Sequence, residues 1–162
     1  MKQSIQLSLL VCLLSVSVFA DVPNYSGTWI LDESKIENNG QKHGAVPSKI
    51  TIIHEGTQFK TERLLSSPMQ GDVTVKEDLT LDGKPCPSDT EVGPRVSTAV
   101  WSEEQKAVLI ESEMKLNFGG GDYQIQFHET WSIQPDGSLK IHSKRNSPRG
   151  ERESIYYYKR NK

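Results

Sequence analysis

Short segments of alternating apolar and polar residues, separated by tight-turn sequences, occupy most of the chain from Gly27 to Arg160. Asp82-Gly83 and Pro135-Asp136-Gly137 are typical of turns between paired strands. No long stretch of this region keeps the 3.6-residue spacing of an amphipathic helix. Strands joined by short turns pair antiparallel, and such a sheet removes its exposed edges by closing on itself. The sequence therefore predicts an all-β, up-and-down antiparallel barrel of about 8–10 strands.

Three segments interrupt this pattern. Residues 33–48 are polar and predict a long connection, with one helical turn near Ser34 to Ile36. Residues 85–94 contain proline and glycine, so we expect a loop there. Gly119-Gly120-Gly121 lacks the lysine that ends a phosphate-binding loop, and it predicts a plain hairpin connection.

The first twenty residues have the features of an export signal. Lys2 is followed by an apolar run from Leu7 to Phe19, and small residues stand at Val18 and Ala20. This order is typical of a secretory signal that is cleaved after Ala20. The apolar run is shorter than the roughly 20 residues that a membrane-spanning helix needs. We therefore expect a secreted or periplasmic protein in which residues 1–20 are removed and residues 21–162 form one barrel domain.

Charge and cysteine content narrow the classes of partner. The chain has 19 Lys and Arg residues against 21 Asp and Glu, and it has no basic block. We therefore predict that it does not bind nucleic acid, and no later segment is apolar enough for a transmembrane helix. Removal of Cys12 with the signal leaves Cys86, which then has no partner for an internal disulfide. Because prolines flank Cys86 and no base is near it in sequence, we interpret it as an incidental loop thiol.

Residues two apart on a strand share a face, so an apolar alternate series identifies the inner face of the barrel and its polar exceptions. Glu129 is the one charge in the series from Tyr123 to Ile133. Glu77 is likewise the one charge in the series from Val73 to Leu81, and Arg63 is the one charge in the series from Phe59 to Leu65. The same reasoning predicts further polar groups on inner faces: His54, Ser112, Ser143, Arg145 and a tyrosine group of the last strand that includes Tyr157.

Two interpretations of these polar groups stay open. In the first, they form an ion-pair network that fills a narrow barrel, with Arg63 paired to Glu77 on the neighbouring strand. In the second, they line a wet cavity in which Arg63 binds the acidic head of a ligand and apolar residues line a tail site. The candidate ligand-binding residues are Arg63, Glu77, Glu129, Phe127, Ile125, Ser112, His54 and Tyr157.

Three short motifs follow one another along the chain: Ser26-Gly27-Thr28-Trp29-Ile30-Leu31, Leu81-Asp82-Gly83-Lys84 and Glu129-Thr130-Trp131-Ser132. Together with the signal, they make the chain resemble the small secreted bacterial lipocalin-like (calycin) proteins. The first motif is also similar to the opening of lipocalin and fatty-acid-binding-protein barrels. The resemblance implies that Trp29 plugs one end of the barrel, with Lys159 or Arg160 stacked on its ring. The long segment at residues 33–48 departs from the lipocalin pattern.

The sequence offers little for other chemistry. Its four histidines lack metal-ligand spacing, so we predict no metal site and no cofactor. We name no catalytic residue, although Glu77 and Glu129 leave open a small barrel enzyme that uses them as acid and base. The function that we expect is non-covalent binding of a small amphipathic or hydrophobic ligand inside the barrel. The alternative is an extracytoplasmic protein-interaction or inhibitor module with a filled barrel.

Overall fold

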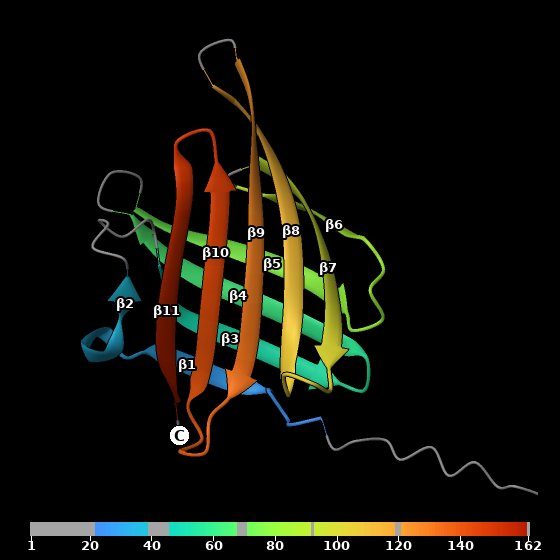
Figure 1. Ribbon diagram of the computed structural model, residues 1–162, viewed down its shortest axis with the longest axis vertical. Helices are drawn as coiled ribbons and strands as arrows, with labels where there is room; N and C mark the ends of the chain where they lie inside the picture. The colour runs from blue at the N-terminus through green and yellow to red at the C-terminus, as the bar shows by residue number, and fades with distance from the viewer. Residues whose placement is uncertain (1–21, 39–45, 68–70, 92, 119–120, 162) are drawn as a thin grey trace, which may run out of the picture.

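The computed structural model describes residues 22–38, 46–67, 71–91, 93–118 and 121–161 (Figure 1). The predicted export signal and Gly119-Gly120 therefore lie outside the described residues. Within them, eleven strands and one 3-10 turn are present. The elements are β1 Gly27–Leu31, η1 Glu33–Lys35, β2 Glu37–Asn38, β3 Pro47–Glu55, β4 Gln58–Ser67, β5 Gly71–Thr80, β6 Cys86–Thr90, β7 Gly93–Ser102, β8 Ala107–Phe118, β9 Gly121–Ile133, β10 Leu139–Ser147 and β11 Gly150–Arg160.

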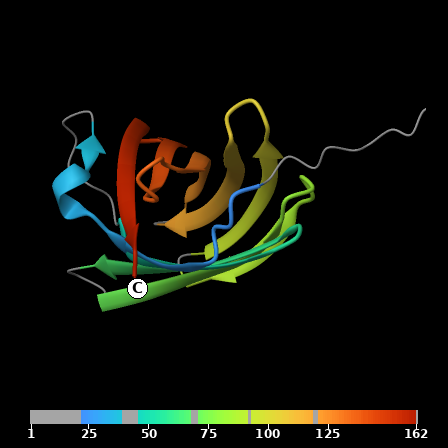
Figure 2. The same ribbon diagram turned by 90° about the horizontal axis from the view of Figure 1, so that it is seen from below.

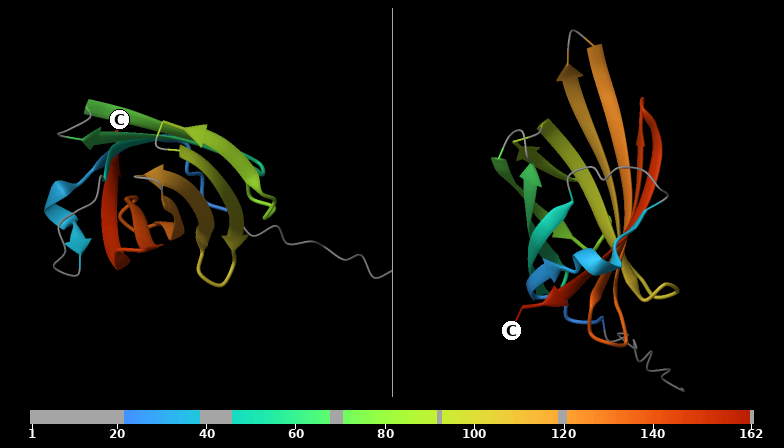
Figure 3. Two further views of the ribbon diagram at one scale, coloured as in Figure 1. Left: turned by 90° about the horizontal axis from the view of Figure 1, so that it is seen from above. Right: turned by 90° about the vertical axis from the view of Figure 1, so that its left-hand side faces the viewer.

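Ten of these strands form one antiparallel, up-and-down sheet that curves into a nearly closed barrel. The hydrogen-bonded order is β5-β4-β3-β1-β11-β10-β9-β8-β7-β6, and the short β2 pairs with β11. Strands β3 to β5 form one wall, and β7 to β11 form the opposite one (Figures 2 and 3). The two ends of this path, β5 and β6, lie next to each other without a ladder between them. The predicted all-β barrel is confirmed, and so is the helical turn after the first strand.

The prediction of a loop at residues 85–94 is wrong. Cys86–Thr90 forms β6, which pairs antiparallel with β7 from Cys86 opposite Ser97 to Thr90 opposite Gly93. Because β6 has a ladder on one side only, Pro87 can stand in it without breaking a hydrogen bond that a central strand would need. Cys86 is consequently a strand residue, and its partly buried side chain packs against the core. It is therefore not a loop thiol.

Aromatic side chains fill one end of the barrel, which we call the closed end. Trp29, Tyr25, Phe59, Trp131 and Tyr158 are all fully buried there. The indole Nε1 of Trp29 donates to the carbonyl of Tyr25 (2.9 Å), and the Tyr25 hydroxyl donates to the carbonyl of Trp131 (2.9 Å). The ring of Phe59 meets that of Trp131 edge-on, with 5.9 Å between centroids. This packing matches the predicted plug, although the sequence did not indicate Tyr25.

Arg160, the last residue of β11, covers this plug from outside. Its guanidinium carbon lies 4.6 Å from the centre of the Trp29 ring, so the cation implied by the resemblance is Arg160. Gly27 lies under the same side chain, with φ +133° and Arg160 Cγ 3.8 Å from where a Cβ would stand. Glycine suits both this backbone conformation and the close approach.

Burial falls steadily along the inner face, from the closed end toward the end where the β8–β9 hairpin projects (Figure 1). On β9, Trp131 is fully buried, Phe127 and Ile125 are half-buried, and Tyr123 is 41% exposed. On β10, Leu139 and Ile141 are buried, whereas Arg145 is half-buried. We call this second end the open end. No helix within the described ranges is long and apolar enough to cross a bilayer.

Candidate functional site

A belt of polar side chains crosses the interior between the closed and open ends. Three of its charged members, Arg63, Glu77 and Glu129, interrupt apolar strand faces, as the alternation predicted. The belt consists of Arg63 on β4, Glu77 on β5, Arg95 and Ser97 on β7, Ser112 on β8 and Glu129 on β9. All six are buried, so their charges must be compensated inside the protein.

Arg63 is the centre of the belt. Its Nη1 donates to both carboxylate oxygens of Glu129 (2.9 and 3.1 Å), and its Nη2 donates to Glu77 Oε2 (2.9 Å). Its guanidinium carbon also lies 4.9 Å from the centre of the Trp131 ring. Burial opposes the charged form, but the two carboxylates outweigh it and raise the pKa of Arg63. The predicted Arg63–Glu77 pair is therefore present, and whether Arg63 also contacts a ligand stays a prediction.

Glu77 joins Arg63 to a second arginine, which sequence reasoning missed. Arg95 Nε lies 3.2 Å from Glu77 Oε1, and the Ser97 hydroxyl donates to the same oxygen (2.6 Å). Burial alone would raise the pKa of Glu77, but Arg63, Arg95 and Ser97 lower it below its ordinary value. A carboxyl held ionised in this way is a poor general acid at neutral pH. Arg95 was missed because residues 85–94 were interpreted as a loop that ended just before it.

Arg95 is less well compensated than Arg63. It shares Glu77 with Arg63, and its Nη2 donates to the neutral hydroxyl of Ser112 (2.8 Å). Its guanidinium carbon lies 4.8 Å from the centre of the Phe127 ring. Burial and the nearby Arg63 cation together lower the pKa of Arg95. Ser112 and Phe127 therefore lie beside this arginine, as inner-face residues of β8 and β9.

Arg145 stands on the inner face of β10, nearer the open end. It lies directly opposite Phe127 on β9 and Arg152 on β11 in the strand register. Its Nε is buried and has no hydrogen-bond partner among the described residues, and no carboxylate of those residues pairs with it. Burial, followed by the Arg152 and Arg149 cations, lowers the pKa of Arg145. Arg145, Arg149 and Arg152 therefore lie close enough together for their charges to repel.

Two predicted site residues lie away from the belt. His54 follows Ile50 and Ile52 on β3 as predicted, but its ring packs at the closed end against Tyr25 (5.8 Å) and Phe59 (5.5 Å). Burial there lowers the pKa of His54. Tyr157 is on the outer face, so the prediction that it lies inside the barrel is wrong. Because β11 alternates, the inward residues are its neighbours Tyr156 and Tyr158, which pack with the core.

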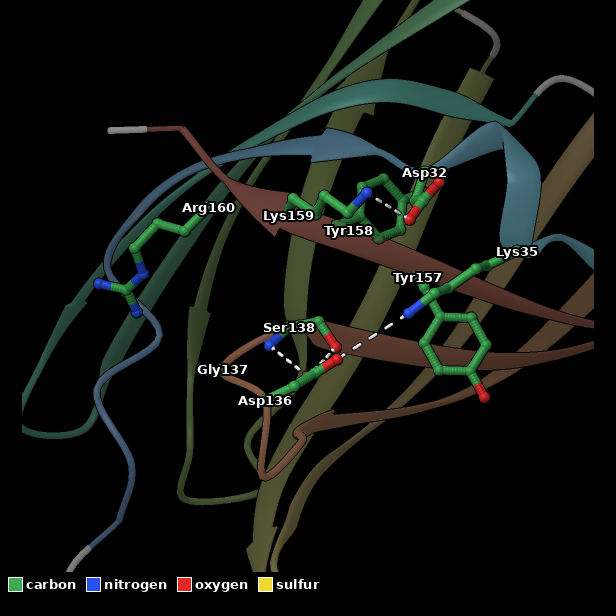
Figure 4. Close-up of a pocket in the computed structure, with 9 residues that line it drawn as sticks. All are labelled: Asp32, Lys35, Asp136, Gly137, Ser138, Tyr157, Tyr158, Lys159 and Arg160. Carbon is green, nitrogen blue, oxygen red and sulfur yellow. Dashed lines mark hydrogen bonds and ion pairs between the residues drawn. The ribbon is translucent and has the colours of Figure 1, made fainter.

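Tyr157 lines a separate outer pocket of about 340 Å³ beside η1 and the β9–β10 turn (Figure 4). The two acids in this pocket already have lysine partners. Lys159 Nζ lies 2.8 Å from Asp32 Oδ2, and Lys35 Nζ lies 3.9 Å from Asp136 Oδ2. Hydrogen bonds from Lys159 and Ser34 hold the pKa of Asp32 at about 2. These internal pairs leave the pocket without a clear preference for the charge of a ligand.

The described residues contain no group of three or more His, Cys, Asp or Glu side chains that could hold a metal ion. The groups inside the barrel are guanidinium groups, the paired carboxylates of Glu77 and Glu129, hydroxyls and apolar side chains. Such groups bind and orient a ligand. Ile125 and Phe127, predicted as apolar lining, stand on β9 between the belt and the open end.

No protein-family model matches this sequence, and no curated protein matches it. Among solved structures, the zebrafish ileal bile acid-binding protein complexed with cholic acid is similar to this chain, with a TM-score of 0.50 and 15% sequence identity. The match covers 85% of this chain and 98% of that one. Similarity at this level shows the fold alone, an all-β, nearly closed up-and-down barrel.

Proposed function

We propose that this protein binds a small amphipathic molecule with an acidic head, without covalent chemistry, at the open end of its barrel. Arg145 is the observation on which the proposal depends. Its guanidinium is half-buried on an inner face and lacks a carboxylate partner within the described part of the chain. A half-buried cation without a counter-ion has lost part of its hydration, and a carboxylate or phosphate of a ligand would compensate this loss.

The surroundings of Arg145 support an apolar ligand body. Phe127 lies directly across the ladder from it, and Ile125 and Met114 continue the same inner wall. The similar zebrafish protein was solved with cholic acid, which is itself an amphipathic acid. The closed end is already filled by aromatic side chains, so the accessible inner surface is the half that contains Arg145.

A matched pair of ligands tests the acidic head. Dodecanoate and dodecan-1-ol have the same chain, and titration calorimetry should show saturable binding of the acid with clearly weaker binding of the alcohol. Arg145→Met should weaken dodecanoate binding about tenfold, which corresponds to about 1.4 kcal/mol for a partly exposed charge-assisted contact. The same substitution should leave the alcohol unchanged.

Lys144→Met is the control, since it removes one positive charge from the adjacent outer-face residue, which pairs with Glu153 at 3.5 Å. It should leave dodecanoate binding unchanged. If wild-type protein binds neither ligand, the proposed function is wrong. If Lys144→Met weakens binding as much as Arg145→Met, the acid is attracted by overall charge and not by the inner wall.

We further propose that the chain is exported and that residues 21–162 are the mature protein. The support is the order of Lys2, the apolar run and Ala20 in the sequence. The full chain should yield a product whose N-terminus is Asp21 in the extracytoplasmic fraction, as read by mass spectrometry. Replacing Ala20 with Arg should block this cleavage, and a product that keeps Met1 in the wild type would contradict the proposal.

A further inference from the structure

Two arginines mark the ends of one inner wall of the barrel. Arg95 is on β7 and Arg145 is on β10, and strands β8 and β9 lie between them (Figure 1). Neighbouring strands are about 4.8 Å apart, so the two backbone positions are separated by about 15 Å along the wall. The arginine side chains extend inward and shorten the distance between their charged groups.

The wall between the two arginines is apolar. Met114 stands directly opposite Arg95 on the β7–β8 ladder, and Ile125 stands opposite Met114 on the next ladder. Phe127 has the Arg95 guanidinium over its ring and Arg145 as its register partner on β10. A ligand body lying here would contact methylene and aromatic groups and would meet a cation at each end.

The Arg95 end is more deeply buried, and one polar atom beside Arg95 has no hydrogen-bond partner among the described residues. Arg95 is 6% exposed and shares one carboxylate with Arg63. Ser88 on β6 is its direct cross-strand partner, and the Ser88 hydroxyl oxygen is buried with no hydrogen-bond partner among the described residues. In native proteins nearly all buried hydroxyls have a protein or water partner. An apolar ligand end placed here would remove water from Arg95 and Ser88 without replacing the lost hydrogen bonds.

We propose that the ligand is polar at both ends. This inference rests on the proposed function, because it places the acidic head at Arg145. The inner end then carries a hydroxyl or carbonyl oxygen, which Ser88 and Arg95 recognise. An apolar body of medium length joins the two ends and lies across Met114, Ile125 and Phe127. Simple fatty acids fit the head and body of this site but not its inner end.

The test compares dodecanoate with 12-hydroxydodecanoate, which differ only by a hydroxyl on the terminal carbon. In an apolar pocket the added hydroxyl would weaken binding about tenfold or more, because it would be buried without a partner. At the Ser88 end it should strengthen binding at least fivefold. Calorimetric titration of both acids into wild-type protein therefore distinguishes the two cases by the sign of the change.

Ser88→Ala should abolish the advantage of the hydroxy acid. Dodecanoate binding should not weaken, because its alkyl end then removes water from one hydroxyl fewer. Thr98→Val is the matched control, because Thr98 lies on the outward phase of β7, between inward Ser97 and Ala99. It should keep the advantage in full. Neither hydroxyl has a hydrogen-bond partner in the part of the chain that the structure describes. Circular dichroism checks that each variant is folded.

Three outcomes overturn the inference. If dodecanoate binds as tightly as the hydroxy acid, or more tightly, the inner end of the site is not polar. The proposed function would still stand. If the hydroxy acid still binds more tightly than dodecanoate to the Ser88→Ala variant, Ser88 does not recognise the hydroxyl. Failure of both acids to bind wild-type protein would reject the proposed function, and the inference with it.

Discussion

The closed and open ends of the barrel are built from the same strands but differ in what their inner faces contain. At the closed end, Trp29, Tyr25 and Trp131 are fully buried, and two of their polar hydrogens have backbone carbonyl partners. At the open end, Arg145 is half-buried and its Nε has no partner among the residues described. We therefore expect the closed end to provide most of the stability, and the contrast is the basis for proposing a ligand site at the open end.

The polar belt separates these two ends. Its two arginines and two glutamates balance in charge, and every carboxylate oxygen has at least one donor. A ligand that enters from the open end therefore meets this belt before it reaches the aromatic plug. Under the proposed function, the belt would limit how deep an apolar chain can go, because an alkyl group cannot hydrogen-bond to buried charged groups.

The largest expected effect tests the closed end. Trp29→Ala should lower the free energy of unfolding by about 3–5 kcal/mol, because it empties a fully buried indole site and removes the surface on which Arg160 stacks. Urea denaturation measures the change. Tyr123→Ala, at the 41% exposed end of β9, should cost no more than about 1 kcal/mol. If the two substitutions lower the free energy of unfolding equally, the closed end does not contribute more to stability than the open end.

The next effect tests the belt. Arg63→Met leaves Glu129 buried without a cation and should lower the free energy of unfolding by about 3 kcal/mol. This is the low end of the range for a broken buried pair, because Arg95 still pairs with Glu77. The double variant Arg63→Met/Glu129→Gln removes one charge of each sign and should recover much of this loss. Additive losses in urea melts of the three proteins would show that the two residues are not coupled.

A smaller effect concerns acid stability. The pKa of Glu77 is lower in the folded protein than its ordinary value of 4.5. The contribution of ionised Glu77 to the free energy of unfolding is therefore complete above the ordinary pKa. It is lost as the pH falls through the lower pKa of the folded protein. Urea melts between about pH 7 and about pH 3 should show this loss, and Glu77→Gln should flatten the profile. Asp78→Asn, on the exposed face of the same strand, should keep the wild-type slope.

The smallest effect concerns the seam between β5 and β6. Cys86→Ser should cost about 1 kcal/mol, because the sulfur is partly buried against the core and the new hydroxyl is harder to bury. Thr80, whose Oγ1 lies 3.8 Å from Cys86 Sγ, offers the serine a partner that limits the loss. Dodecanoate binding should not change. Loss of binding in this variant alone would extend the ligand site toward the seam.

Much of the barrel could be predicted because strand alternation is a local property. The positions of Glu129, Glu77 and Arg63 on inner faces follow from counting residues by twos along each strand. The same counting placed Tyr157 inside, because all the side chains from Ile155 to Tyr158 are apolar or aromatic and either phase looks equally suitable. Only packing against Leu139 and Trp29 decides that Tyr158 faces inward.

The sequence by itself determined that this chain forms a barrel with charged groups on its inner face, since turn signals and alternation act between near neighbours. Tertiary structure alone decided which charges meet. Arg63 reaches Glu129 across the barrel, 66 positions away in sequence, and Arg95 joins them because residues that look like a loop form an edge strand. It also left Arg145 without a carboxylate within the described residues, because ion pairing depends on distances in space that no local pattern encodes.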